Sequence, residues 1–139
     1  MNRFVRSGVV ALALCALSLA GCETKRLWLQ VTGLDDGIVD GIWLWRLSQE
    51  SGTYERACRF PFAGTDAPGN IERLDYIQEC GGGSTNLKFS VPIKRSLSHP
   101  DTVTVGIWYV DRYGGAGTYK ISSYGLYGET SLSGSAIQL

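Results

Sequence analysis

Histidine is almost missing from this chain, because His99 is the only one among its 139 residues. Histidine is the most frequent general base in enzymes and the commonest metal ligand. His99 stands next to Pro100 in a predicted polar loop, residues 94–101, and no serine lies in a Gly-x-Ser-x-Gly turn. We therefore expect no enzyme and no cofactor, and a small hydrolase is the least supported candidate function.

A hydrophobic run long enough to span a bilayer is also missing. A spanning helix needs about 20 mostly apolar residues, whereas the apolar run at residues 8–20 holds 13 and is followed by polar residues 23–26. Arg3 and Arg6 precede this run, and that order of charged, apolar and small residues is typical of an export signal. We predict that residues 1–21 are a leader that is removed from the mature protein.

The segment Leu19-Ala20-Gly21-Cys22 resembles the lipobox of bacterial lipoproteins. The resemblance implies cleavage before Cys22, which then carries a diacylglycerol on its sulfur and a further acyl chain, such as palmitate, on its amino group. Burial of each acyl methylene contributes about 0.8 kcal/mol, so two or three chains hold a protein at the membrane. The alternative is an ordinary secretory peptide that leaves Cys22 as an unmodified thiol.

The same resemblance implies a location for the mature chain. In Gram-negative lipoproteins an aspartate after the cysteine commonly retains the protein in the inner membrane, and Glu23 stands there instead, which favours the outer membrane. We expect residues 22–26 to form an acylated tether of at most about 17 Å. Residues 27–139 then form one domain close to the lipid headgroups.

An excess of positive charge is absent. The chain has 13 Lys and Arg against 13 Asp and Glu, and loss of Arg3 and Arg6 with the leader leaves the mature chain near −2. The remaining basic residues are scattered among acidic ones, whereas a nucleic-acid surface requires a basic stripe. We predict no nucleic-acid partner.

Cysteine is scarce, with four in the chain. Cys15 leaves with the leader and Cys22 is acylated, so Cys58 and Cys80 remain as a pair. Disulfides persist in the oxidising compartments that exported proteins enter. We predict a Cys58–Cys80 disulfide, which closes a loop of about 22 residues and contributes about 3 kcal/mol. The alternatives are two free thiols or a metal site, which lacks histidine partners.

Helical periodicity is rare in the mature sequence, where apolar residues alternate with polar ones. Alternation is the pattern of β-strands, and Gly-rich turns separate the alternating segments. We predict an all-β fold of about seven or eight antiparallel strands in a two-sheet sandwich, which resembles immunoglobulin and fibronectin domains in architecture. Residues 71–78 space Ile71, Leu74 and Ile77 three apart, which indicates one short helix. The expected strands are 27–32, 38–47, 53–60, 87–91, 102–111, 118–124 and 130–139.

Aromatic residues are abundant for one small domain. Trp43 and Trp45 alternate in one predicted strand, and Trp108 and Tyr109 lie in another. Large aromatic residues most often fill a core. On a solvent face they would instead form a platform on which sugars stack.

Three aspartates lie in and beside a glycine-containing turn, and they are Asp35, Asp36 and Asp40. Aspartate stabilises turns through hydrogen bonds to the local backbone, which is the favoured role here. Calcium binding is the alternative, because Ca²⁺ prefers carboxylate and carbonyl oxygens, although the spacing is not that of an EF-hand loop.

These observations predict a lipid-anchored binding or structural module of the cell envelope. The favoured partner is an envelope protein, for which the domain would serve as an accessory subunit with an exposed apolar patch or an open strand edge. The alternative is a glycan- or peptidoglycan-binding module that uses surface tryptophans.

Overall fold

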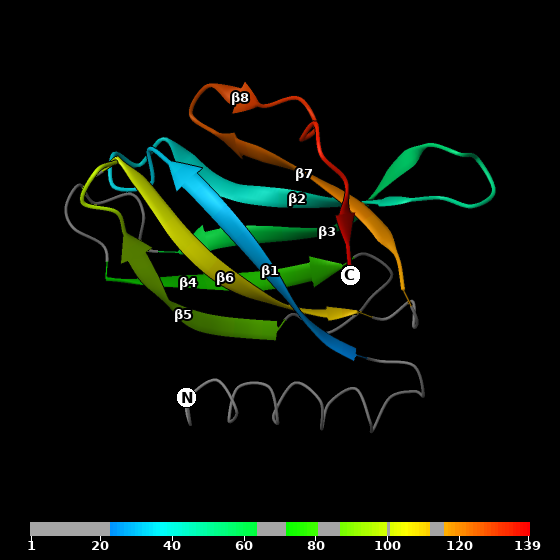
Figure 1. The fold of residues 1–139 in the computed structure, drawn as a ribbon, viewed down its shortest axis with the longest axis horizontal. Helices are drawn as coiled ribbons and strands as arrows, with labels where there is room; N and C mark the ends of the chain where they lie inside the picture. Colours follow the sequence, from blue (N-terminus) through cyan, green and yellow to red (C-terminus); the bar gives the residue numbers. More distant parts are fainter. Residues whose placement is uncertain (1–22, 64–71, 81–86, 100, 112–115) are drawn as a thin grey trace.

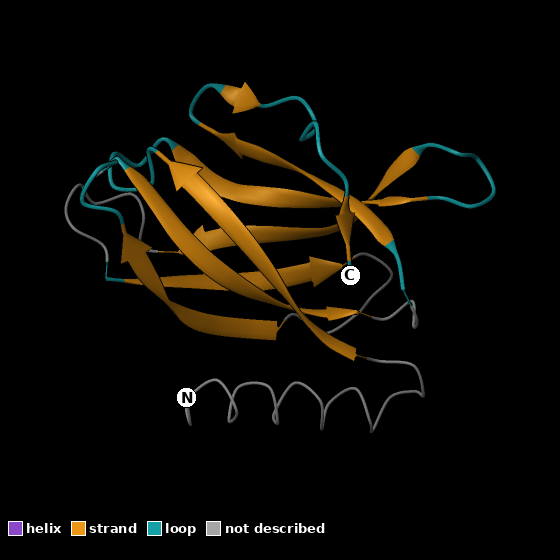
Figure 2. Cartoon of the chain, viewed as in Figure 1, coloured by secondary structure: helices purple, strands orange, loops and turns teal. Residues whose placement is uncertain are grey.

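The computed structural model describes residues 23–63, 72–80, 87–99, 101–111 and 116–139. Within these ranges the chain forms strands joined by loops, and Figure 2 shows no helix there. The predicted leader and Cys22 lie outside the described residues. No helix in the described ranges is both long and apolar enough to cross a lipid bilayer. The strands are β1 (Glu23–Thr32), β2 (Val39–Leu47), β3 (Tyr54–Ala63), β4 (Arg73–Cys80), β5 (Leu87–Arg95), β6 (Thr102–Asp111), β7 (Thr118–Gly125), β8 (Gly128–Glu129) and β9 (Ile137–Gln138).

Hydrogen bonds join these strands into one antiparallel sheet. The strand order is β1-β6-β5-β4-β3-β2-β7-β8, and β9 pairs with β7. In Figure 1, β1 and β6 cross over β2, β3 and β4, so the sheet curls into a half-barrel around its core. The predicted all-β antiparallel fold is confirmed. The division into two separate sheets is not confirmed, because paired neighbours run without a break from β1 to β8.

Strand β5 carries the sheet around its corner. Its first part, from Leu87 to Pro92, pairs with β4, whereas Ile93 to Arg95 pair with β6. Pro92 stands where the partner changes, and proline has no N–H to donate to a ladder. One strand therefore belongs to both halves of the curled sheet, and the core lies between them.

The core is built from the inward-facing residues of each strand. In β6, Val103, Val105, Ile107 and Tyr109 are all nearly inaccessible to solvent, as expected when every second residue of a strand points to the same face. Leu27, Leu29 and Val31 of β1 are also buried, and each is paired in register with one of the buried β6 residues. The alternation predicted for residues 102–111 is therefore confirmed.

The predicted short helix at residues 71–78 is wrong. The part of this segment that the structure describes belongs to strand β4, where Leu74, Tyr76 and Gln78 are buried on one face. Ile77 lies on the opposite face and is only partly buried. Leu74 and Ile77, which are three residues apart, therefore lie on opposite faces of a strand. The two-residue period was hidden in the sequence because two of the buried positions, Tyr76 and Gln78, carry polar side chains.

Several predicted boundaries also differ from the structure, and β3 and β5 extend beyond their predicted ends to Ala63 and Arg95. Strand β1 begins at Glu23, whose backbone is paired with Asp111, so residues 23–26 belong to the sheet and not to a free tether. The Lys25 side chain lies on the same inward face as Leu27, two residues later, and forms an ion pair with buried Asp111. The strand expected at residues 130–139 is limited to Ile137–Gln138, because residues 130–133 bind β7 partly through side-chain hydroxyls.

Candidate functional site

A groove opens between β1 and the chain that follows β8. Its floor is apolar, and its volume is about 220 Å³. Pockets for small molecules usually measure about 300–1,000 Å³, so this groove suits the side chains of an extended segment better than an enclosed small molecule. The floor residues are Leu29, Val31, Val39, Ile42 and Ile121.

Hydroxyl and amide groups form the rim of the groove. Gln30 and Thr32 of β1 lie on one side, and Thr130, Ser131 and Ser133 lie on the other. None of the described residues that line the groove carries a charge. A ligand therefore meets an apolar floor between two neutral hydrogen-bonding walls.

The two walls differ in their backbone pairing. Segment 130–133 is hydrogen-bonded to β7, since Thr130 N–H donates to the Ser123 carbonyl and Ser133 N–H donates to the Ile121 carbonyl, both at 2.8 Å. Strand β1 pairs with β6 along one edge and with no other described strand. The edge of β1 that borders the groove is therefore open, whereas that of β7 is closed.

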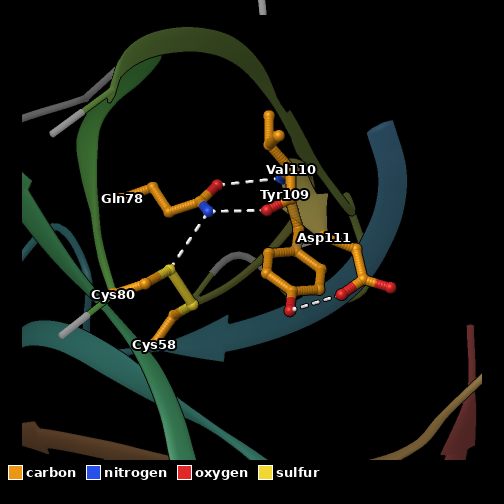
Figure 3. The surroundings of a disulfide bond; sticks show 6 residues. All are labelled: Cys58, Gln78, Cys80, Tyr109, Val110 and Asp111. Carbon is orange, nitrogen blue, oxygen red and sulfur yellow. Dashed lines mark hydrogen bonds between the residues drawn. A yellow bond between two sulfur atoms is a disulfide. The ribbon is translucent and has the colours of Figure 1, made fainter. Parts of the chain in front are cut away.

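The predicted disulfide between Cys58 and Cys80 is confirmed, and it joins β3 to β4 (Figure 3). Beside it, Gln78 bonds to both backbone groups of Val110: the Val110 N–H donates to Oε1 at 2.9 Å, and Nε2 donates to the Val110 carbonyl at 2.9 Å. The pairing of β5 with β6 covers only residues 93–95. The Gln78 carboxamide therefore satisfies the Val110 backbone groups on the edge of β6 that β5 does not reach, while β1 pairs with the other edge.

A buried ion pair lies at the end of the core where β1 begins. Lys25 Nζ is 2.7 Å from Asp111 Oδ2, and these side chains are 10% and 0% exposed. Lys25 also donates to the Leu139 carbonyl at 3.0 Å, and the Tyr109 hydroxyl donates to the other Asp111 oxygen at 3.3 Å. This network fastens the C-terminus to β1, and we assign it a structural role because each charge has a direct partner.

Trp43 and Trp45 lie on the outward face of β2, outside the core that tryptophan was expected to fill. Arg56 lies over both rings, at 4.4 and 5.0 Å from their centroids. Arg59 lies 5.9 Å from the Trp43 centroid and is hydrogen-bonded to Glu79, which raises the pKa of Arg59 above its usual value. Arginines therefore occupy the ring faces that a stacked sugar would use.

A second arginine–tryptophan stack lies on the outward face of β1 and β6. The Arg26 guanidinium is 4.7 Å from the Trp28 centroid and 4.3 Å from the Trp108 centroid. Trp28 is 58% exposed, and Trp108 is partly buried. Desolvation lowers the pKa of Arg26, yet a guanidinium remains protonated at neutral pH. Tyr109, predicted with these tryptophans, is instead fully buried in the core.

The aspartates and the histidine are placed apart from the groove. Asp35 forms a bidentate ion pair with Arg95, and Asp36 and Asp40 are exposed. No group of three or more His, Cys, Asp or Glu side chains in the described ranges is placed to hold a metal ion. His99 lies on an exposed loop, where its Nδ1 is 3.0 Å from the neighbouring Ser98 hydroxyl.

Sequence reasoning missed the groove and the contacts of Arg26, Lys25 and Gln78. Lys25 and Asp111 had a usable signal, because each occupies an inward position of a strand whose other inward residues are apolar. The groove had no local signal, since its residues come from three strands and a loop.

Comparisons of the chain with models of protein families, with curated proteins and with solved structures give no match.

Proposed function

We propose that this protein is a non-enzymatic binding module of the cell envelope, anchored by acyl chains on Cys22, and that β1 accepts an extended segment of a partner protein. The open edge of β1 beside the apolar groove carries this proposal. The lipobox-like segment that ends at Cys22 supports export and anchoring, and Glu23 supports the outer membrane if the cell is Gram-negative.

An added strand matches the chemistry of the groove. An open edge offers N–H and C=O groups that pair with an extended peptide, and such pairing supplies affinity while alternate side chains supply specificity. The apolar floor around Leu29 and Val31 would receive every second side chain of that peptide. Because the lining residues are uncharged, we expect a segment with apolar inward residues and no charge among them.

The glycan-binding alternative has less support. A sugar platform requires ring faces that are open to solvent. On β2 the faces of Trp43 and Trp45 are partly covered by Arg56, and on β1 the face of Trp28 is covered by Arg26. A glycan would have to displace these arginines.

Photo-crosslinking in cells that express the protein tests the proposal. A photoreactive residue in place of Ser131, on the wall opposite β1, should capture a partner, whereas the same residue in place of exposed Ser90 on β5 should not. The captured peptide should be an extended segment with alternating apolar residues, as identified by mass spectrometry.

A matched pair of substitutions ties that capture to the edge of β1. Gln30→Lys places a charge on the open edge, where lysine blocks strand addition, and should lower the crosslink at least tenfold. Thr104→Lys places the same charge on the paired β6 neighbour of Gln30 and should leave it unchanged. Equal crosslinks at Ser131 and Ser90, or a crosslink that Gln30→Lys does not alter, would contradict the proposal.

A further inference from the structure

The outward face of β1 and β6 differs in charge from the outward face of the other half of the sheet. The even-numbered residues 26–32 and 102–108, which alternate with the core residues of these strands, include Arg26, two tryptophans and several threonines, but no carboxylate. Lys94 of β5 pairs with Thr104 and adds a second cation to this face. The other half instead carries paired charges, such as Arg56 with Glu129.

Arg26 is held in place at the centre of this face. Its Nε donates to the Gly106 carbonyl at 3.0 Å, and its guanidinium lies over the rings of Trp28 and Trp108. Gly106 leaves the space for this arrangement, because a Cβ at that position would lie 2.5 Å from Arg26 Nε. The face therefore presents a fixed cation beside an exposed indole.

The position of this face along the chain indicates what covers it. Strand β1 begins at Glu23, directly after the cysteine proposed to be acylated. At about 3.3 Å per residue, Trp28 lies about 20 Å along the strand from Cys22. Because β1 begins at the residue that follows Cys22, no flexible spacer separates the proposed anchor from the sheet. The first residues of β1 therefore lie at the level of the lipid headgroups.

We propose that the outward face of β1 and β6 docks on the surface of a lipid bilayer, with Trp28 at headgroup level and Arg26 and Lys94 facing lipid phosphates. Tryptophan favours the interface between water and hydrocarbon because its ring is apolar and its N–H is polar. Arginine binds phosphate oxygens in bidentate fashion, and cations are attracted to anionic lipid surfaces. This inference rests on the proposed acylation of Cys22.

Fluorescence quenching of the acylated protein in vesicles tests the docking. The vesicles contain phosphatidylethanolamine, phosphatidylglycerol and a lipid with a nitroxide on its headgroup, and intact mass first confirms the acyl chains on Cys22. The nitroxide lipid should lower the fluorescence of the wild type, and Trp28→Phe should remove at least half of that decrease. Trp43→Phe, on the other half of the sheet, should preserve the decrease.

A second pair of variants keeps the experiment informative if Trp28→Phe disturbs folding. Gly106→Ala displaces Arg26 and should reduce the quenching at least twofold, whereas Gly134→Ala, which meets no atom within 4 Å, should not. Full quenching in acylated Trp28→Phe protein overturns the docking but leaves the anchor and the β1 groove standing. Absence of acyl chains on Cys22 overturns the anchor and this inference together, whereas crosslinking at Ser131 reports on the groove alone.

Discussion

Replacing Gln78 with methionine should destabilise the protein by about 2–6 kcal/mol. Gln78 lies in β4, is 2% exposed, and bonds to both backbone groups of Val110 at 2.9 Å. Val110 is fully buried, and β5 does not pair with β6 at this level. Methionine preserves the approximate shape of the side chain but cannot replace these two hydrogen bonds.

The magnitude follows from the two backbone groups that lose their partner. An unsatisfied buried N–H or C=O costs about 1–3 kcal/mol, and Val110 would have one of each. The loss is a large part of the 5–15 kcal/mol that typically stabilises a domain. Because the Gln78 amide also lies 3.2 Å from Cys80 Sγ, packing around the disulfide changes as well.

Equilibrium urea unfolding, followed by tryptophan fluorescence, measures this effect. Gln30→Met on the exposed face of β1 is the matched control and should change the free energy of unfolding by less than about 0.5 kcal/mol. Amide hydrogen exchange should also show that Val110 loses protection in Gln78→Met. A Gln78→Met stability within 0.5 kcal/mol of the wild type would refute the bridging role.

Three further predictions concern other parts of the molecule. Cys58→Ala with Cys80→Ala should lower the free energy of unfolding by about 3 kcal/mol, and alkylation without prior reduction should leave the wild-type mass unchanged; two alkylated thiols would contradict the disulfide. Burial raises the pKa of Tyr76, whose hydroxyl bonds to Trp108 N and O at 2.6 and 2.9 Å. The unfolded chain therefore loses this proton above about pH 10 while the folded chain retains it. The difference in free energy of unfolding between the wild type and Tyr76→Phe should be largest below pH 10. Above pH 10 this difference should fall by up to about 1.4 kcal/mol per pH unit. Urea unfolding at pH 8 and pH 11 measures it, and an equal difference at both pH values would contradict the effect of burial. Cys22→Ala should abolish labelling by radioactive fatty acid and retention in the membrane fraction, and persistence of both would contradict the lipid anchor.

The strands could be predicted where burial and alternation agree. Residues 102–111 are the clearest case, because Val103, Val105, Ile107 and Tyr109 all point into the core and the predicted bounds match β6. The turn at residues 33–37 also followed from its glycines, since Gly33 and Gly37 both adopt positive φ. These features depend on local sequence alone.

The remaining features depend on contacts between distant segments. Tyr76 and Gln78 are polar side chains on the core face of β4, and their partners in β6 are 32 residues away. A sequence pattern that counts apolar residues therefore misread β4 as a helix. The curled single sheet was equally hidden, because it depends on the change of partner along β5 at Pro92.

The tryptophans show the same limit at the surface. Composition alone does not show whether a tryptophan lies in the core or on a surface platform. The structure places Trp43 and Trp45 on the outward face, beneath arginines of the neighbouring strand. Arg59 is paired in register with Trp43, and Arg26 with Trp108. Cross-strand register, which decides these stacks, cannot be read from one strand.

We propose that β1 receives a partner strand along its open edge. Amide hydrogen exchange of β1, measured on the acylated protein alone and in complex with the partner captured at Ser131, tests this most directly. We predict that amides within residues 28–32 exchange at least tenfold more slowly in the complex, because strand addition pairs them. Unchanged exchange across β1 in a complex that is otherwise intact would contradict the claim.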